Sequence, residues 1–303
     1  MKGHIANMKM RWLSIVPASS ILLLFSCGRM TEAQDSKFGS LQTIYASVDY
    51  ELPTRTAIDG NLKTTWLAGD AINVFFGSSE SSRFVTSESG EVAQFKGSID
   101  VVTGGGEGLD DDTCLWGVYP YDANTACDGK YVTLTLPAWQ KATENTIANG
   151  LFPLIAKSRN FYMSFYNLCG SFWFSVKNSD ICSVTLSGNN GEPIAGKARV
   201  SMDKTPSVEE IIFGEKELSM TAPDGGCFRP GVKYYFALYP TVFEKGLTIT
   251  YHKKDSYASY VISKSYTLRR NVFSYFKDRD SELTFTSESL IDWEKGESVE
   301  GKI

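Results

Sequence analysis

Apolar and polar residues alternate over short stretches along most of this chain, and Gly, Asn, Asp and Pro stand between the stretches. Alternation with a period of two is typical of β-strands with one buried face, and turn-forming residues are typical of the connections. The pattern predicts strands at 43–50, 71–76, 98–102, 114–119, 130–136, 161–165, 171–176, 182–186, 196–202, 209–213, 232–239, 247–252, 257–263, 272–276 and 283–285.

No stretch shows a convincing helical stripe with caps, so an all-β fold built from β-sandwiches is expected. These strands are too many for one sandwich and suit two in tandem. We predict an N-terminal sandwich at residues 43–157 and a C-terminal one at 158–303. The stretch 232–239 is apolar almost throughout, which predicts a central strand, whereas 139–150 is the least regular stretch and predicts a loop.

The start of the chain is typical of an export signal. Lys2, Lys9 and Arg11 precede an uncharged, largely apolar stretch that ends in Leu24-Phe25-Ser26-Cys27. The stretch is short for a membrane span, and a small residue before a Cys suits the bacterial lipoprotein signal peptidase. Residues 1–26 are therefore predicted to be a lipoprotein signal peptide, Cys27 the lipid attachment site and 27–42 a linker. An ordinary secretory signal is the alternative.

Composition and charge exclude several functional classes. Aromatic residues make up 13% of the chain, in keeping with strands, and the formal net charge is −5. Loss of residues 1–26 removes three positive charges, which leaves 27 Lys+Arg against 35 Asp+Glu and a net charge of −8. An acidic chain without a basic patch does not predict a nucleic-acid partner.

Histidine is scarce, which restricts the chemistry. His4 lies in the predicted signal, so His252 is the single imidazole of the mature chain. A site with two or three His ligands is thereby excluded, and His252 itself is expected at the exposed end of a strand. The Gly-rich stretch 104–108 lacks the ending of a phosphate loop, and Asp110, Asp111 and Asp112 lack the alternating spacing of a calcium loop. We predict no catalytic residue, no metal site and no cofactor.

Five cysteines follow Cys27, and an odd number cannot all pair within one chain. After export, one or two disulfides are an option, with Cys114 and Cys127 among the nearest in sequence. Buried thiols within strands are the alternative.

An ordered series of short motifs runs from Thr54 to Gly170. Singly each is weak, but together they follow one another at plausible spacing behind the signal. The series is Thr54-Arg55-Thr56, Trp66-x-x-Gly69-Asp70-x-Ile72-x-Val74-Phe75, Phe95-x-Gly97, Trp116-x-x-Tyr119-Pro120-Tyr121, Leu134-x-Leu136-Pro137-x-x-Gln140, Pro153-Leu154-x-Ala156 and Phe165-Tyr166-Asn167-Leu168-Cys169-Gly170. The chain resembles the fimbrillin family, the type V pilin-like lipoproteins of Bacteroidota.

The physical interpretation of the same residues is structural. Trp66, Phe75, Phe95 and Trp116 are large apolar side chains suited to a core, and Gly69-Asp70 suits a tight turn. Independently of the family, these residues are expected to determine the fold rather than to bind a ligand.

The resemblance implies two transthyretin-like sandwiches in a fimbrial subunit that is exported to the outer membrane and cell surface as a lipoprotein. It also implies processing between Arg55 and Thr56, loss of the first strand, and insertion of a strand from another subunit into the vacated groove. The alternative is an Arg55 that is not cut, in an anchor or accessory subunit. The implied partners are other fimbrial subunits, with the membrane reached through the lipid.

A second hypothesis is a lipid-anchored binding module that does not polymerise and that captures a glycan or a host protein. Sugar stacking would need an exposed aromatic ring. Trp139, in a polar stretch beside Gln140 and Lys141, is the candidate contact residue.

Overall fold

The structure is a computed structural model that describes residues 40–48, 65–99, 114–287, 290–292 and 297–299. The chain divides into two compact units, Met1–Lys37 and Phe38–Ile303, and all described residues belong to the second. Within them there is no α-helix, only short 3-10 turns at η2 (Pro223–Gly225) and η3 (Arg279–Glu282). The all-β prediction is confirmed.

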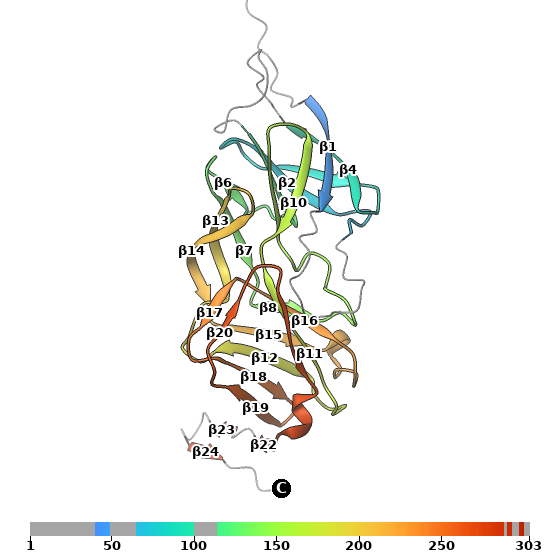
Figure 1. Cartoon of the computed structure of the whole chain (residues 1–303). Coiled ribbons are helices and arrows are strands. Elements are labelled where there is room, and N and C mark those ends of the chain that lie inside the picture. Colours follow the sequence, from blue (N-terminus) through green and yellow to red (C-terminus); the bar gives the residue numbers. More distant parts are fainter. Residues whose placement is uncertain (1–39, 49–64, 100–113, 288–289, 293–296, 300–303) are drawn as a thin grey trace, which may run out of the picture. The chain divides into compact units, whose positions relative to one another are not determined.

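Seven strands form a closed barrel in the order β1-β10-β9-β5-β2-β3-β4. Their bounds are β1 (Ser40–Val48), β2 (Ala71–Phe76), β3 (Ser82–Thr86), β4 (Val92–Ile99), β5 (Leu115–Tyr119), β9 (Leu154–Ser158) and β10 (Tyr162–Asn167). Of these, β1, β2, β4 and β10 are labelled in Figure 1. Closure leaves the sheet without a free edge, because every strand has two neighbours.

The remaining strands form sandwich-like sheets. The three larger ones run β22-β19-β18-β12-β15-β8, β14-β13-β7-β6 and β16-β11-β21, and the two-stranded ones are β17-β20 and β23-β24. The bounds are β6 (Ala126–Cys127), β7 (Val132–Leu136), β8 (Trp139–Lys141), β11 (Gly170–Ser175), β12 (Ser183–Gly188), β13 (Ala195–Met202), β14 (Pro206–Glu215), β15 (Glu217–Thr221), β16 (Tyr234–Leu238), β17 (Thr241–Phe243), β18 (Leu247–His252), β19 (Ser256–Ile262), β20 (Tyr266–Leu268), β21 (Phe273–Lys277), β22 (Thr286–Ser287), β23 (Leu290–Asp292) and β24 (Glu297–Val299).

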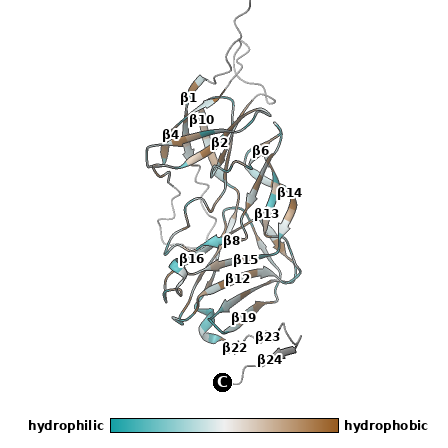
Figure 2. Cartoon of the chain, turned by 180° about the vertical axis from the view of Figure 1, so that it is seen from behind, coloured by the Kyte–Doolittle hydropathy of each residue, from teal (hydrophilic) through white to brown (hydrophobic). Residues whose placement is uncertain are grey.

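Strand β5 buries both of its faces and thereby joins two hydrophobic cores. Leu115 and Tyr119 belong to the core inside the barrel, and an added Cβ at Gly117 would meet the Phe165 ring at 2.6 Å. Trp116 and Val118 point the other way, into a second core. That core includes residues of the later sheets, as far along the sequence as Phe276. Hydrophobic and hydrophilic residues are interspersed along the strands (Figure 2). Because successive residues of a strand point to opposite faces, shifting the pairing by one residue would exchange the two faces.

The predicted core residues and several predicted strands agree with the structure. Trp66, Phe75, Phe95 and Trp116 are all at most 1% exposed, and the strand at 71–76 has the predicted bounds. The pattern missed β3, most of β4, β9, β15 and the two- or three-residue strands β6, β8, β17, β20, β22, β23 and β24. Of these, β8 lies in the stretch 139–150, which was predicted to be a loop. The strand predicted at 283–285 is wrong, because the chain there leaves η3 in irregular conformation.

The strand pairing does not divide near residue 158. Strand β10, which follows that position, belongs to the barrel, whereas β7 and β8, which precede it, pair with β13 and β15. Residues 157 and 158, between which the boundary was expected, are the last two residues of the barrel strand β9. Hydrophobic alternation identifies strands but not their partners, so the division into two domains stays a prediction.

Strand β16 corrects another expectation. All five of its residues are buried, as the apolar pattern at 232–239 predicts, but β16 is an edge strand rather than a central one. The Gln140 side chain takes the place of a neighbouring strand there: its Nε2 donates to the Ala237 carbonyl (2.8 Å), and its Oε1 accepts from the Ala237 N–H (2.9 Å). One buried amide thus satisfies both backbone groups of Ala237 at this edge.

Cys182 and Cys227 form a disulfide, and Cys114, Cys127 and Cys169 are thiols. The pairing of Cys114 with Cys127, one option from the sequence, is therefore not formed, and the alternative of buried thiols holds for Cys114 and Cys169. The backbone brings the two bonded residues together, since Ala222 N–H donates to the Cys182 carbonyl (2.9 Å) and Phe228 N–H to the Ile181 carbonyl (2.8 Å). Burial raises the pKa of the Cys127 thiol to about 12, which disfavours the reactive thiolate.

Replacing Cys182 or Cys227 with Ser should lower the free energy of unfolding by about 2–4 kcal/mol, because the bond closes a loop of 45 residues. Urea denaturation checks this, and the double variant should equal each single variant. Wild-type protein in reductant should match the variants. Equal stability of oxidised and reduced wild-type protein would contradict the prediction.

Candidate functional site at the first strand and the adjoining pocket

Strand β1 closes the barrel by pairing along both of its edges. It is antiparallel to β4, from Ser40 opposite Ile99 to Ser47 opposite Val92. It is parallel to β10, from Tyr45 opposite Tyr162 to Val48 opposite Phe165. Without β1, both β4 and β10 would present unpaired N–H and C=O groups.

The two faces of β1 differ in burial. Ile44 and Ala46 are completely buried and Val48 is 7% exposed, so alternate side chains point into the barrel core. Each fully buried Ile or Val contributes roughly 1.5–3 kcal/mol relative to an exposed one. The buried face therefore holds β1 in place through apolar contacts as well as through backbone hydrogen bonds.

Trp66 connects the barrel core to the β1 backbone. Its indole Nε1–H donates to the Ala46 carbonyl (3.0 Å). The ring meets Phe95, Tyr119 and Phe165 edge to face, with centroids 4.9–5.4 Å apart. Edge-to-face contact suits aromatic quadrupoles, so the indole is well fixed while it bonds to β1.

On the outer surface, Tyr45 of β1 stacks on Tyr162 of β10. The ring centroids are 4.9 Å apart, the planes differ by 16°, and the two residues are 38% and 68% exposed. The stack adds a contact between β1 and β10 that does not depend on the core.

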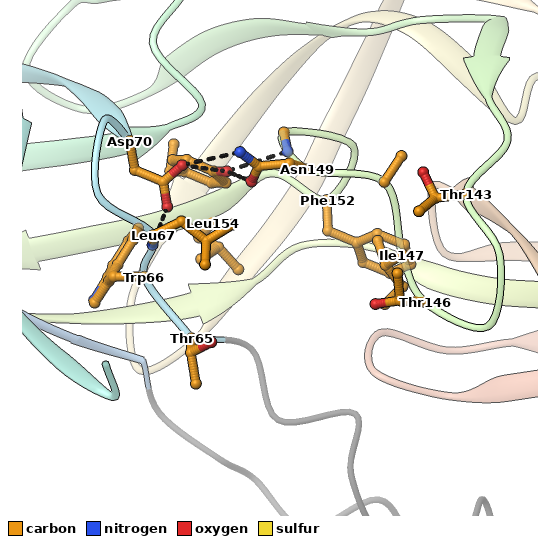
Figure 3. A pocket seen from close by; sticks show the side chains of 13 residues that line it. Thr65, Trp66, Leu67, Asp70, Thr143, Thr146, Ile147, Asn149, Phe152 and Leu154 are labelled. Atoms are coloured by element: carbon orange, nitrogen blue, oxygen red, sulfur yellow. Dashed lines mark hydrogen bonds between the residues drawn. The ribbon is translucent and has the colours of Figure 1, made fainter. Parts of the chain in front are cut away.

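A pocket of about 380 Å³ lies beside Trp66 and contains a polar network (Figure 3). Asp70 Oδ2 accepts from the Leu67 N–H (2.8 Å), and Asp70 Oδ1 accepts from Asn149 Nδ2 (3.2 Å). The Tyr119 hydroxyl lies 2.5 Å from Asn149 Oδ1 and 3.3 Å from Asp70 Oδ1, and it accepts from the Gly150 N–H (3.1 Å). The network joins the turn before β2 to the end of β5 and to the segment before β9.

Burial and the neighbouring Asp70 carboxylate raise the pKa of Tyr119 well above its usual range. The phenol therefore keeps its proton, and with it the ability to donate a hydrogen bond. The sequence pattern predicts Asp70 only as a turn residue, and the turn is present, with Gly69 at φ +96°. The partnership with Tyr119 and Asn149 was missed, because these residues are 49 and 79 positions away in sequence.

The structure describes only some of the residues that the sequence predicts to carry function. Cys27, Arg55, Thr56 and the loops at 104–108 and 110–112 lie outside the described residues. Trp139 begins the short strand β8 and is 75% exposed. His252 ends β18, as predicted, but is half-buried rather than exposed.

The described residues contain neither a membrane-spanning helix nor a metal-binding group. They contain no helix with the length and apolarity that a membrane crossing requires. The same residues bring together no group of three or more His, Cys, Asp and Glu side chains that could hold a metal ion.

No protein-family model matches the chain, and neither does any curated protein sequence. Among solved structures it is similar to two chains described as "putative cell adhesion protein". The one from Bacteroides ovatus ATCC 8483 has a TM-score of 0.48 and 14% identity, over 82% of this chain and 96% of that one. The one from Bacteroides thetaiotaomicron VPI-5482 has a TM-score of 0.36 and 12% identity, over 79% and 92%.

A third similar chain is a fimbrial protein of Bacteroides ovatus ATCC 8483, with a TM-score of 0.30 and 12% identity over 71% of this chain and 44% of that one. These scores and identities are low. The functional proposal therefore rests on the strands and contacts of this chain itself.

Replacing Trp66 with Phe should keep most of the apolar volume but remove the hydrogen bond to the Ala46 carbonyl. We expect the free energy of unfolding to fall by about 1–3 kcal/mol. Hydrogen exchange should rise most in β1, compared with the distant strand β18. Uniform exchange across both strands would contradict a specific role in holding β1.

Replacing Tyr119 with Phe should lower the free energy of unfolding by about 1–3 kcal/mol at neutral pH, because buried polar partners lose a hydrogen bond. A tyrosine whose folded pKa is raised stabilises the fold below its unfolded pKa of about 10 and loses that contribution as pH rises further. Urea denaturation between neutral pH and about pH 11 should therefore show a smaller alkaline loss in the variant. Parallel pH curves would refute this assignment.

Proposed function

We propose that this chain is a structural or adhesive subunit of a surface fimbria, exported as a lipoprotein and joined to other subunits by exchange of its first strand. One observation carries the proposal: β1 is paired along both edges inside a barrel that needs it for closure. The ordered motifs that resemble the fimbrillin family point the same way.

Departure of β1 would create a groove with a defined pattern. The edges of β4 and β10 would offer backbone hydrogen bonds, and the positions of Ile44, Ala46 and Val48 would offer apolar space. An incoming strand would satisfy both by β-augmentation. It would need apolar side chains at alternate positions, with a small one in the middle.

The place of Arg55 in the chain suits release of β1. Strand β1 ends at Val48, and the next described segment begins at Thr65. A cut between Arg55 and Thr56 falls between these points, so it would separate β1 and the lipid-bearing Cys27 from the rest of the barrel. Until then the lipid would hold the precursor at the outer membrane.

The alternative function is a lipid-anchored module that binds a glycan or a host protein and does not polymerise. The exposed Trp139 is the observation that favours it. In that case β1 would be a permanent barrel strand, and a cut at Arg55 would leave a stable monomer.

Cleavage at Arg55 should convert the purified protein into SDS-resistant multimers, seen as a ladder on unheated gels that collapses on heating. Each exchanged strand would dissociate very slowly, because it is held by backbone hydrogen bonds on both edges and by buried apolar contacts. The measurement is limited digestion with an Arg-specific protease, with N-terminal sequencing to confirm a new terminus at Thr56.

Arg55→Lys is the matched control, since it keeps the charge but is not cut by this protease. A peptide with the sequence of residues 40–48 should suppress the ladder, and the same peptide with Asp in place of Ile44 and Ala46 should not. A stable monomer after a confirmed cut would refute self-polymerisation and favour the alternative.

A further inference from the structure

Trp139 is unusual among the described tryptophans because most of its side chain faces solvent. It is 75% exposed, whereas Trp66 and Trp116 are at most 1% exposed and Trp173 is half-buried against Tyr275. An exposed indole leaves a large apolar face in water without a packing partner, and such rings are enriched where proteins bind ligands.

The backbone beneath Trp139 is held firmly. Strand β8 pairs in parallel with β15, with Trp139 opposite Ser219, and the Ser219 N–H donates to the Ala138 carbonyl (2.8 Å). The next residue, Gln140, is 5% exposed and bonds to both backbone groups of Ala237. The exposed ring is thus carried by a fixed strand, which reduces the ordering cost of binding.

A shallow pocket of about 400 Å³ lies beside the ring, and polar groups line it. Its walls include Glu215 at the end of β14, Lys216 in the connection, and Glu217 and Ser219 of β15. Within the described chain, the carboxylates of Glu215 and Glu217 and the ammonium of Lys216 form no ion pair and no side-chain hydrogen bond. These groups are therefore available to a ligand.

An exposed indole beside uncommitted hydrogen-bonding groups matches the chemistry of a sugar. The C–H face of a pyranose ring stacks on the electron-rich face of an indole, and carboxylates accept hydrogen bonds from hydroxyl groups. The volume also falls in the usual range for ligand pockets, about 300–1,000 Å³.

The charges around the pocket restrict the class of sugar. The pocket is lined by two carboxylates, those of Glu215 and Glu217, and by one ammonium, that of Lys216, and the whole chain has a net charge of −5. A sulfated or sialylated glycan would be repelled. We propose that Trp139, Glu215 and Glu217 form a binding site for a neutral glycan. This site deepens the alternative function by naming the residues and the ligand class, and it does not depend on strand exchange.

The test is isothermal titration of the purified full-length protein with maltohexaose, cellohexaose and mannohexaose, and with a heparin hexasaccharide as the anionic probe. At least one neutral probe should bind and the anionic probe should not. Trp139→Ala should weaken binding by about tenfold or more, and Glu215→Gln with Glu217→Gln by roughly tenfold. Trp139→Phe, which keeps an aromatic face, should retain binding within about threefold of wild type.

Tyr275→Ala is the matched control, because Tyr275 is an aromatic residue that is 58% exposed and lies outside this pocket. The Tyr275→Ala variant should bind the neutral probe with the affinity of wild type, and circular dichroism should show that all variants are folded. The proposal is overturned if no neutral probe binds at up to about 10 mM or if Trp139→Ala binds as well as wild type. It is also overturned if sedimentation shows that the effect of Trp139→Ala is only to dissociate a dimer.

Discussion

The double pairing of β1 is the constraint on which the barrel depends. A sheet of β10, β9, β5, β2, β3 and β4 has two free edges, and β1 removes both at once by pairing with β4 and β10. The inward side chains of β1 complete the core, and Trp66 bonds to its backbone. A single strand of nine residues thus decides whether the barrel is closed or open.

The barrel strands that contribute buried residues to the second core are not neighbours of β1. In the barrel, β5 is separated from β1 by two strands on one side and three on the other. The outer residues of β5, Trp116 and Val118, enter the core shared with the later sheets, together with Phe75 of β2 and Ile155 of β9. The proposed exchange at β1 would therefore not remove a neighbour of β5.

Trp139 and Gln140 show how neighbouring residues on one short strand divide their roles. The polar stretch predicts a loop. In the structure Gln140 is buried and bonds to the Ala237 backbone at the edge of β16, while Trp139 is exposed to solvent. A sequence can nominate Trp139 as a contact residue. It cannot identify Glu215 and Glu217 as its neighbours, because the parallel pairing of β8 with β15 brings together segments more than seventy residues apart.

The sequence by itself determined the all-β class and the large core residues, because alternation and aromatic content are local properties that each strand carries alone. Only the tertiary structure decided strand partners, the closure of the barrel, the Cys182–Cys227 bond and the network of Asp70, Tyr119 and Asn149. These features depend on contacts between distant segments. Many pairings are compatible with one alternating pattern, and the shared burial of whole faces selects among them.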